Sequence, residues 1–136
     1  MTEPSEWPEL HATRTAVPAV DRARLPAGPG VIAFYRGGRA VWFGRSAGLR
    51  ATFAQVFATT GPGAVSPLRR AAAIFLDIAP AQAIRTGRYR PTEADHVLIS
   101  AWLRQCDVGW KETPGPREAV ELEYRLLREP AGSRSA

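Results

Sequence analysis

Residues Gly30–Phe53, GVIAFYRGGRAVWFGRSAGLRATF, contain the pattern that decides the fold. Two short apolar runs, which begin at Val31 and at Val41, are rich in the β-branched and aromatic residues that are typical of strands. Between the runs, Gly37 and Gly38 lie where a tight hairpin turn needs positive φ. This stretch therefore predicts a β-hairpin.

A helix is expected directly after the hairpin, because Gly44-Arg45-Ser46 breaks the second strand. The apolar residues that follow recur at helical spacing: Leu49, Phe53, Val56 and Phe57. The first N–H groups of a helix have no partner within the helix. A basic loop at such a helix start is a plausible place to hold a phosphate group.

The composition is that of one domain, since 136 residues are enough to bury a modest core. The single cysteine, Cys106, excludes an internal disulfide framework and a Cys-based zinc site. The two histidines, His11 and His96, are far apart in the sequence, which argues against a structural metal site. We find no membrane-spanning run and no signal pattern, so we expect a soluble cytoplasmic protein without a membrane partner.

Positive charge is concentrated in one half of the chain, whose formal net charge is +5. The segment Arg22–Arg90 contains about eleven arginines and a single acid, Asp77. Such asymmetry favours a polyanionic partner, nucleic acid first. The alternative is a composition bias, because Lys111 is the only lysine while Ala, Pro and Gly are abundant.

The organisation along the chain is predicted as an extended N-terminal arm (1–24), a domain (25–130) and a flexible tail (131–136). Trp7 and Leu10 are candidates to tie the arm to the domain. Helices are expected after the Ser66-Pro67 cap and after the capping box that begins at Thr92. Val97 and Leu98 of the second helix are expected to face inward. The first of these helices is expected to leave Arg69 and Arg70 near its exposed start, and Pro80–Pro91 is interpreted as a basic connection.

The final helix, Arg117 to about Arg128, contains the most informative single residue. By helical spacing, Glu123 falls within an apolar face formed by Ala119, Leu122, Leu126 and Leu127. A carboxylate among leucines is costly unless it has a partner or binds a cation. The pattern therefore leaves two interpretations open, an ion pair with an arginine of the basic segment and a metal ligand.

Several of these motifs together resemble the GIY-YIG nuclease module. The resemblance rests on GVI at 30–32, VWFGRS at 41–46, the helix start LR at 49–50, and EAVELEYRLL at 118–127 followed by Pro130. It implies a divalent metal on Glu123, Mg²⁺ or Mn²⁺, and hydrolysis of a DNA phosphodiester. It also implies a catalytic position at Trp42. Arg45, on the loop after the strand, is our candidate for a catalytic arginine that reaches the phosphate in place of the arginine that the family has in its first helix.

Three positions depart from the pattern of the family. Ile32 and Trp42 occupy the places of its two tyrosines, and Thr52 occupies the place of the arginine in its first helix. Neither Ile32 nor Trp42 can act as a base. Tyr35 cannot replace the lost tyrosine, because it faces the opposite side of the strand from Ile32.

We therefore predict an α/β fold with a small, mainly antiparallel three-stranded sheet flanked by helices. Its strands are expected at about Gly30–Arg36, Arg39–Arg45 and Asp107–Glu112. One functional hypothesis is an endonuclease that uses Glu123, with Arg45, Arg50, Arg69 and Arg70 on the nucleic acid. The alternative is a catalytically inactive relative that binds nucleic acid or a protein. A third hypothesis is a different hydrolytic or transfer reaction in the same cleft, but no residue pattern in the sequence supports it.

Overall fold

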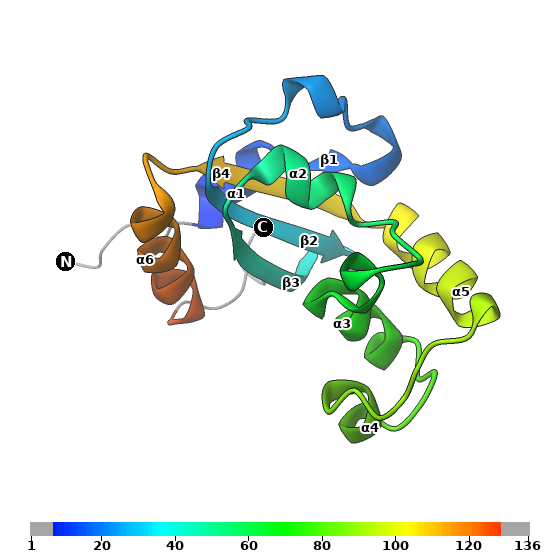
Figure 1. Cartoon of the computed structure of the whole chain (residues 1–136). Coiled ribbons are helices and arrows are strands. Elements are labelled where there is room, and N and C mark those ends of the chain that lie inside the picture. The colour runs from blue at the N-terminus through cyan, green and yellow to red at the C-terminus, as the bar shows by residue number, and fades with distance from the viewer. Residues whose placement is uncertain (1–6, 129–136) are drawn as a thin grey trace.

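The computed structural model describes residues 7–128, apart from the side chain of Pro62. Its centre is an antiparallel sheet of four strands in the order β1-β4-β2-β3 (Figure 1). The strands are β1 (Thr15–Ala16), β2 (Gly30–Arg36), β3 (Arg39–Ser46) and β4 (Asp107–Glu112). The α/β class, the hairpin and the third strand are as predicted, but the expectation of three strands was wrong because the N-terminal segment adds β1.

Six α-helices surround the sheet within the described residues. They are α1 (Trp7–Ala12), α2 (Leu49–Ala54), α3 (Pro67–Phe75), α4 (Ala81–Arg85), α5 (Glu93–Arg104) and α6 (Pro116–Leu127). Short 3₁₀ turns occur at Val17–Ala19, Arg22–Arg24 and Pro62–Val65. None of the helices in the described part of the chain has the length and apolar character needed to cross a bilayer.

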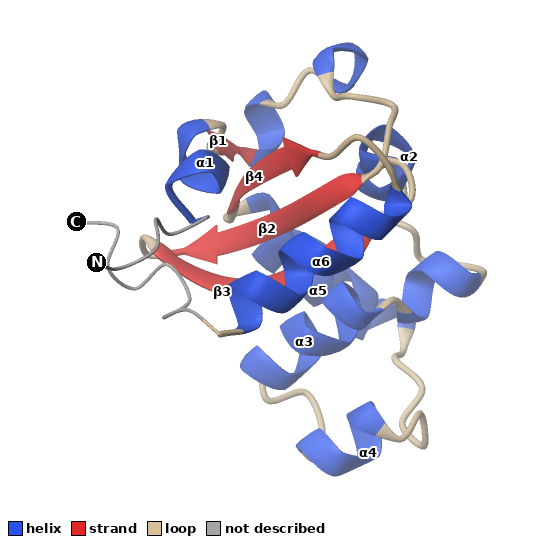
Figure 2. Cartoon of the chain, turned by 90° about the vertical axis from the view of Figure 1, so that its left-hand side faces the viewer, coloured by secondary structure: helices blue, strands red, loops and turns tan. Residues whose placement is uncertain are grey.

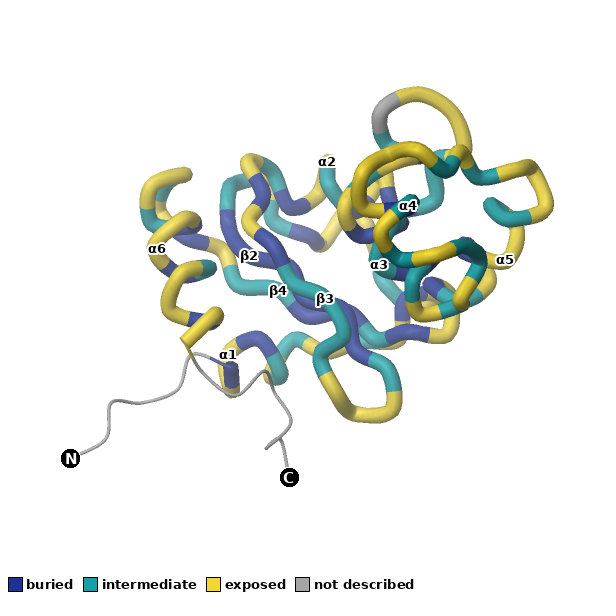
Figure 3. The backbone as a smooth tube through the Cα atoms, turned by 90° about the horizontal axis from the view of Figure 1, so that it is seen from below, coloured by how far each residue is buried: buried dark blue, intermediate teal, exposed yellow. Residues whose placement is uncertain are grey.

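The central strand β2 is buried on both faces (Figure 3). Its residues alternate between two cores because neighbouring side chains of a strand point to opposite sides. Ile32 and Phe34 belong to the larger core, with residues of α2, α3 and α5. Val31, Ala33 and Tyr35 belong to the smaller core, with residues of α1 and α6. Figure 2 shows α6 running along the side of the sheet formed by β2 and β3.

The N-terminal segment is not simply an extended arm. It contains α1 and β1, and the predicted contacts are confirmed, since Trp7 is 2% and Leu10 is 0% exposed. Gly109 of β4 allows this docking, because a Cβ atom there would lie 2.3 Å from the carbonyl oxygen of Leu10. Residues 1–6 and the predicted tail at 131–136 lie outside the described residues.

The sequence predicted where helices begin better than which side of each helix is buried. Ser66 accepts a hydrogen bond from the Arg69 amide, and the capping box of Thr92 and Asp95 is present. By contrast, Val97 and Leu98 are 65% and 54% exposed, although helical spacing placed them inside. The helix α4 was also missed, because Pro80–Pro91 was interpreted as a connection.

Candidate functional site

Two glycines of the hairpin, Gly30 and Gly44, allow other parts of the chain to lie close to its backbone. A Cβ atom on Gly30 would lie 2.2 Å from the backbone oxygen of Lys111, so only glycine permits the pairing of β2 with β4 observed here. A Cβ atom on Gly44 would lie 2.8 Å from Cη2 of Trp42 and 3.7 Å from Oε2 of Glu123. Gly44 therefore gives space to the indole ring and lies beside the carboxylate.

Glu123 of α6 contacts β3 through both carboxylate oxygens. Oε2 accepts a hydrogen bond of 3.0 Å from the backbone amide of Arg45, and Oε1 accepts one of 3.0 Å from its Nη1. The Glu123 side chain is 23% exposed and that of Arg45 is 59% exposed. The carboxylate is thus shielded on the protein side and bound by a cation from the strand.

Trp42, Glu123 and four other residues line a shallow hollow of about 400 Å³ at the free edge of the sheet. The remaining lining residues are Ala40, Val41, Phe43 and Leu127. Trp42 packs against Phe34 with ring centroids 6.3 Å apart, so the indole also belongs to the larger core. The structure therefore brings Trp42, Arg45 and Glu123 together.

The buried stripe of α6 is displaced from the predicted one. Ala119, Leu122 and Leu126 are buried, but Leu127 is 65% exposed. Glu123 consequently lies at the margin of the apolar face and not in its middle. This position explains why its carboxylate reaches Arg45 at the surface.

Two positions that depart from the GIY-YIG pattern, Ile32 and Thr52, have structural roles in this chain. Ile32 is fully buried in the larger core. The Thr52 hydroxyl is hydrogen-bonded to that of Ser46, which in turn accepts from the amide of Gly48 at the start of α2. Neither Ile32 nor Thr52 supplies a group that could activate water.

The other predicted arginines do not join Glu123. Arg50 lies on α2, where its Nε donates to the carbonyl of Leu25 (3.0 Å) and its Nη2 to that of Ala23 (3.3 Å). Arg50 therefore attaches the segment before β2 to α2. Arg70 lies on α3, and its side chain is half-buried.

The expectation that Arg69 is exposed was wrong, since it is 1% exposed. Its side chain crosses from α3 to α5, where it contacts Ser100 and His96. The interpretation of this helix start as a solvated face failed because the side chain turns inward between two helices. His96 is accordingly half-buried, and burial followed by the charge of Arg69 lowers its pKa below the usual value.

Glu123 offers a divalent cation a single carboxylate. Such ions prefer several oxygen ligands, and no group of three or more His, Cys, Asp or Glu side chains suited to a metal occurs between residues 7 and 128. Both oxygens of Glu123 are already bound to Arg45. A cation there would compete with the guanidinium of Arg45 for the carboxylate.

Cys106 is a core residue. It is 1% exposed, and burial raises the pKa of its thiol to about 11, so the reactive thiolate is scarce at neutral pH.

Comparisons with protein-family models, with curated proteins and with solved structures found no match to this chain.

Proposed function

We propose that the protein binds nucleic acid through its arginine-rich surface and does not hydrolyse it. The observation that carries this proposal is a set of exposed arginines that form no ion pair with any residue of the described chain: Arg22, Arg39, Arg85, Arg88 and Arg90. Exposed cations without carboxylate partners are available to neutralise phosphates and to release counterions from a nucleic acid.

The order of elements supports a GIY-YIG-like organisation as part of the proposal. A hairpin of β2 and β3 is followed by helices, by β4 and by the closing helix α6. The glycines at both motif positions, Gly30 and Gly44, have the steric reasons described above. These features agree with the sequence motifs on which the resemblance rests, and they concern the fold more than the chemistry.

The absence of hydrolysis is supported by the chemistry at Glu123. Its carboxylate is bound by Arg45 at two points. Ile32 is sealed in the larger core, and Tyr35 belongs to the smaller core on the other face of the sheet. The described residues that line the hollow at Glu123 include no tyrosine or histidine that could take a proton from water.

A second candidate is an endonuclease dependent on Mg²⁺ or Mn²⁺. One observation favours it, namely that Glu123 and Trp42 line the same hollow next to an exposed arginine. In this alternative an arriving phosphate would draw Arg45 away from Glu123 and leave the carboxylate free.

The two candidates are separated by incubating the protein with plasmid, single-stranded and branched DNA, in Mg²⁺ or Mn²⁺ and in chelator. Binding is read by gel shift and cutting by denaturing electrophoresis of the same samples. We expect shifted but intact DNA in every buffer. Cutting that requires the metal and disappears in Glu123→Ala, while that variant still binds DNA, would establish the endonuclease instead. DNA that is neither shifted nor cut would refute both candidates.

A further inference from the structure

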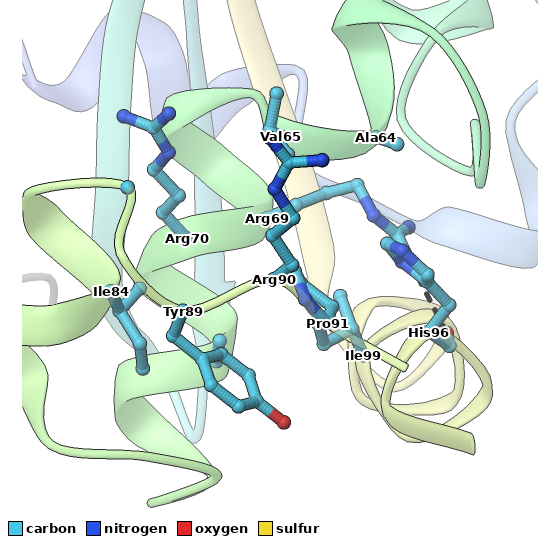
Figure 4. A pocket seen from close by; sticks show the side chains of 12 residues that line it. Ala64, Val65, Arg69, Arg70, Ile84, Tyr89, Arg90, Pro91, His96 and Ile99 are labelled. Carbon is cyan, nitrogen blue, oxygen red and sulfur yellow. Dashed lines mark hydrogen bonds between the residues drawn. The ribbon is translucent and has the colours of Figure 1, made fainter. Parts of the chain in front are cut away.

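A cavity of about 410 Å³ lies between α3, α4 and the start of α5 (Figure 4). This volume is in the range of sites for small ligands. Three arginines line it, Arg69 and Arg70 from α3 and Arg90 from the loop before α5. The described residues that line the cavity include no Asp or Glu.

Arg69 holds a buried charge without a counterion. Nη1 donates to the Val56 carbonyl (2.9 Å) and to Ser100 Oγ (3.1 Å), and Nη2 donates to the His96 carbonyl (3.2 Å). Nη2 also lies 3.3 Å from His96 Nδ1, and Figure 4 shows the Arg69 side chain extending toward His96. All of these partners are uncharged when His96 is neutral. A buried charge that has no opposite charge nearby is costly.

One donor of Arg69 remains unused. Its Nε is buried and has no hydrogen-bond partner among the described residues. A buried N–H without an acceptor carries the full cost of its desolvation. An acceptor supplied by a ligand in the cavity would remove that cost.

Arg70 and Arg90 are also available to a ligand. Within residues 7–128, neither side chain makes a hydrogen bond or an ion pair. Three like charges around one cavity repel one another unless an anion lies between them.

We propose that this cavity binds a small phosphomonoester. A phosphoryl dianion offers several strong acceptors that can be shared among guanidinium groups from different directions. Its charge compensates three arginines better than a single carboxylate would. The apolar part of the ligand is received by the wall formed by Ala73, Ile84 and Ile99, which are all buried.

This site is separate from Glu123. It is formed by α3, α4 and α5, whereas Glu123 lies on α6 at the other side of the sheet (Figures 1 and 2). Of the arginines that the proposed function assigns to nucleic-acid binding, only Arg90 also lines this cavity. The inference is argued from Arg69 and the cavity itself, and its test contains no long nucleic acid.

The test uses the full chain, isothermal titration calorimetry, and NMR detection of arginine Nε–H groups. The probes are inorganic phosphate, phenyl phosphate and, as the uncharged control, phenol. We expect phenyl phosphate to bind about tenfold more tightly than inorganic phosphate because the wall buries its ring, and phenol not to bind. The Nε–H signal of Arg69 should shift, whereas that of Arg50, which already has an acceptor in Leu25, should not.

Variants give a second, independent readout. Arg90→Ala and Arg70→Ala should each weaken phenyl phosphate binding by about tenfold or more, the effect of losing a charge-assisted hydrogen bond. Arg117→Ala is the control, because Arg117 is an exposed arginine of α6 that does not line the cavity. Its affinity should change by less than about twofold.

A pair of short oligonucleotides, with and without a 5′-phosphate, identifies the source of the phosphoryl group. Tighter binding of the phosphorylated one would assign the site to nucleic-acid ends, and equal binding would assign it to a free small molecule. The proposal is overturned if neither phosphate probe binds, if Arg69 Nε–H does not respond, or if Arg117→Ala weakens binding as much as Arg90→Ala.

Discussion

Glu123 and Arg45 are joined at two points, through the backbone amide and the guanidinium of Arg45, each at 3.0 Å from a different carboxylate oxygen. This relationship links the closing helix α6 to the edge strand β3. It also bears on the chemistry proposed for the protein, because a metal ion at Glu123 would compete with the amide and the guanidinium of Arg45 for the two carboxylate oxygens.

Removing either partner of this pair should have a small effect on stability. The pair is partly exposed, and such pairs contribute about 0.2–1 kcal/mol. Glu123→Gln and Arg45→Ala should each lower the free energy of unfolding by less than about 1 kcal/mol, as measured by urea denaturation. Because the two residues interact, the double variant should cost less than the sum. Strictly additive losses would show that the guanidinium contact contributes nothing.

Placing a tyrosine at position 32 should damage the fold and create no cutting activity. Ile32 is 0% exposed, and adding volume to a packed core costs about 1–3 kcal/mol. Ile32→Val is the matched control, with an expected loss of about 0.5–1.5 kcal/mol. Unfolding in urea and a plasmid assay with Mg²⁺ provide the readouts. A stable Ile32→Tyr protein that cuts plasmid would contradict our interpretation of this position.

The two motif glycines should respond differently to alanine. A Cβ at Gly30 meets backbone atoms of β4, which cannot move without separating the strands. Gly30→Ala should therefore cost about 3 kcal/mol, the upper end for overpacking. A Cβ at Gly44 meets the outer edge of the Trp42 ring, which can shift. Gly44→Ala should cost about 1 kcal/mol and move the indole N–H signal of Trp42. The reverse order of stability losses would refute this account of the hairpin.

Stability should fall as the solution becomes more acidic than about pH 6.5, the ordinary pKa of histidine. Burial and the charge of Arg69 lower the pKa of His96 in the folded protein. The unfolded chain therefore binds more protons in this range, so the stability present above pH 6.5 is lost as the pH falls through the lowered value. His11 contributes in the same direction, through burial and Arg14.

The measurement for this prediction is the urea midpoint between pH 7.5 and pH 5. His96→Gln should reduce the slope of stability against pH, and adding His11→Gln should reduce it further. A double variant with the slope of the unmodified protein would assign the pH dependence to other groups.

The local patterns in the sequence predicted the strands β2, β3 and β4 and the starts of α3 and α5. Ser66 and Thr92 satisfy backbone groups close to them in sequence, so their effect is visible without tertiary structure. The added strand β1 was not predictable in this way, because two residues at Thr15–Ala16 are held by pairing with β4, which is far along the chain. Long-range pairing of so short a segment leaves no periodic signal.

In the candidate site too, the features set by local sequence were predictable and those set by long-range contacts were not. Glu123 stood out because a carboxylate interrupts an apolar helical pattern. The burial of Arg69 was missed because its acceptors, on Val56, Ser100 and His96, come from separate segments that only the fold brings together. The sequence contained one usable signal for this burial. Arg69 lies next to Leu68 and three residues before Ala72, and these two residues mark the buried face of α3.

The most direct test of the central claim is the affinity for DNA measured against salt concentration, by anisotropy of a labelled duplex in chelator. If exposed arginines neutralise phosphates, the logarithm of the association constant should fall with the logarithm of the salt concentration at a slope of about −3 or steeper, which corresponds to three or more phosphate contacts. A flat dependence, or no binding at low salt, would contradict the proposal that this protein binds nucleic acid.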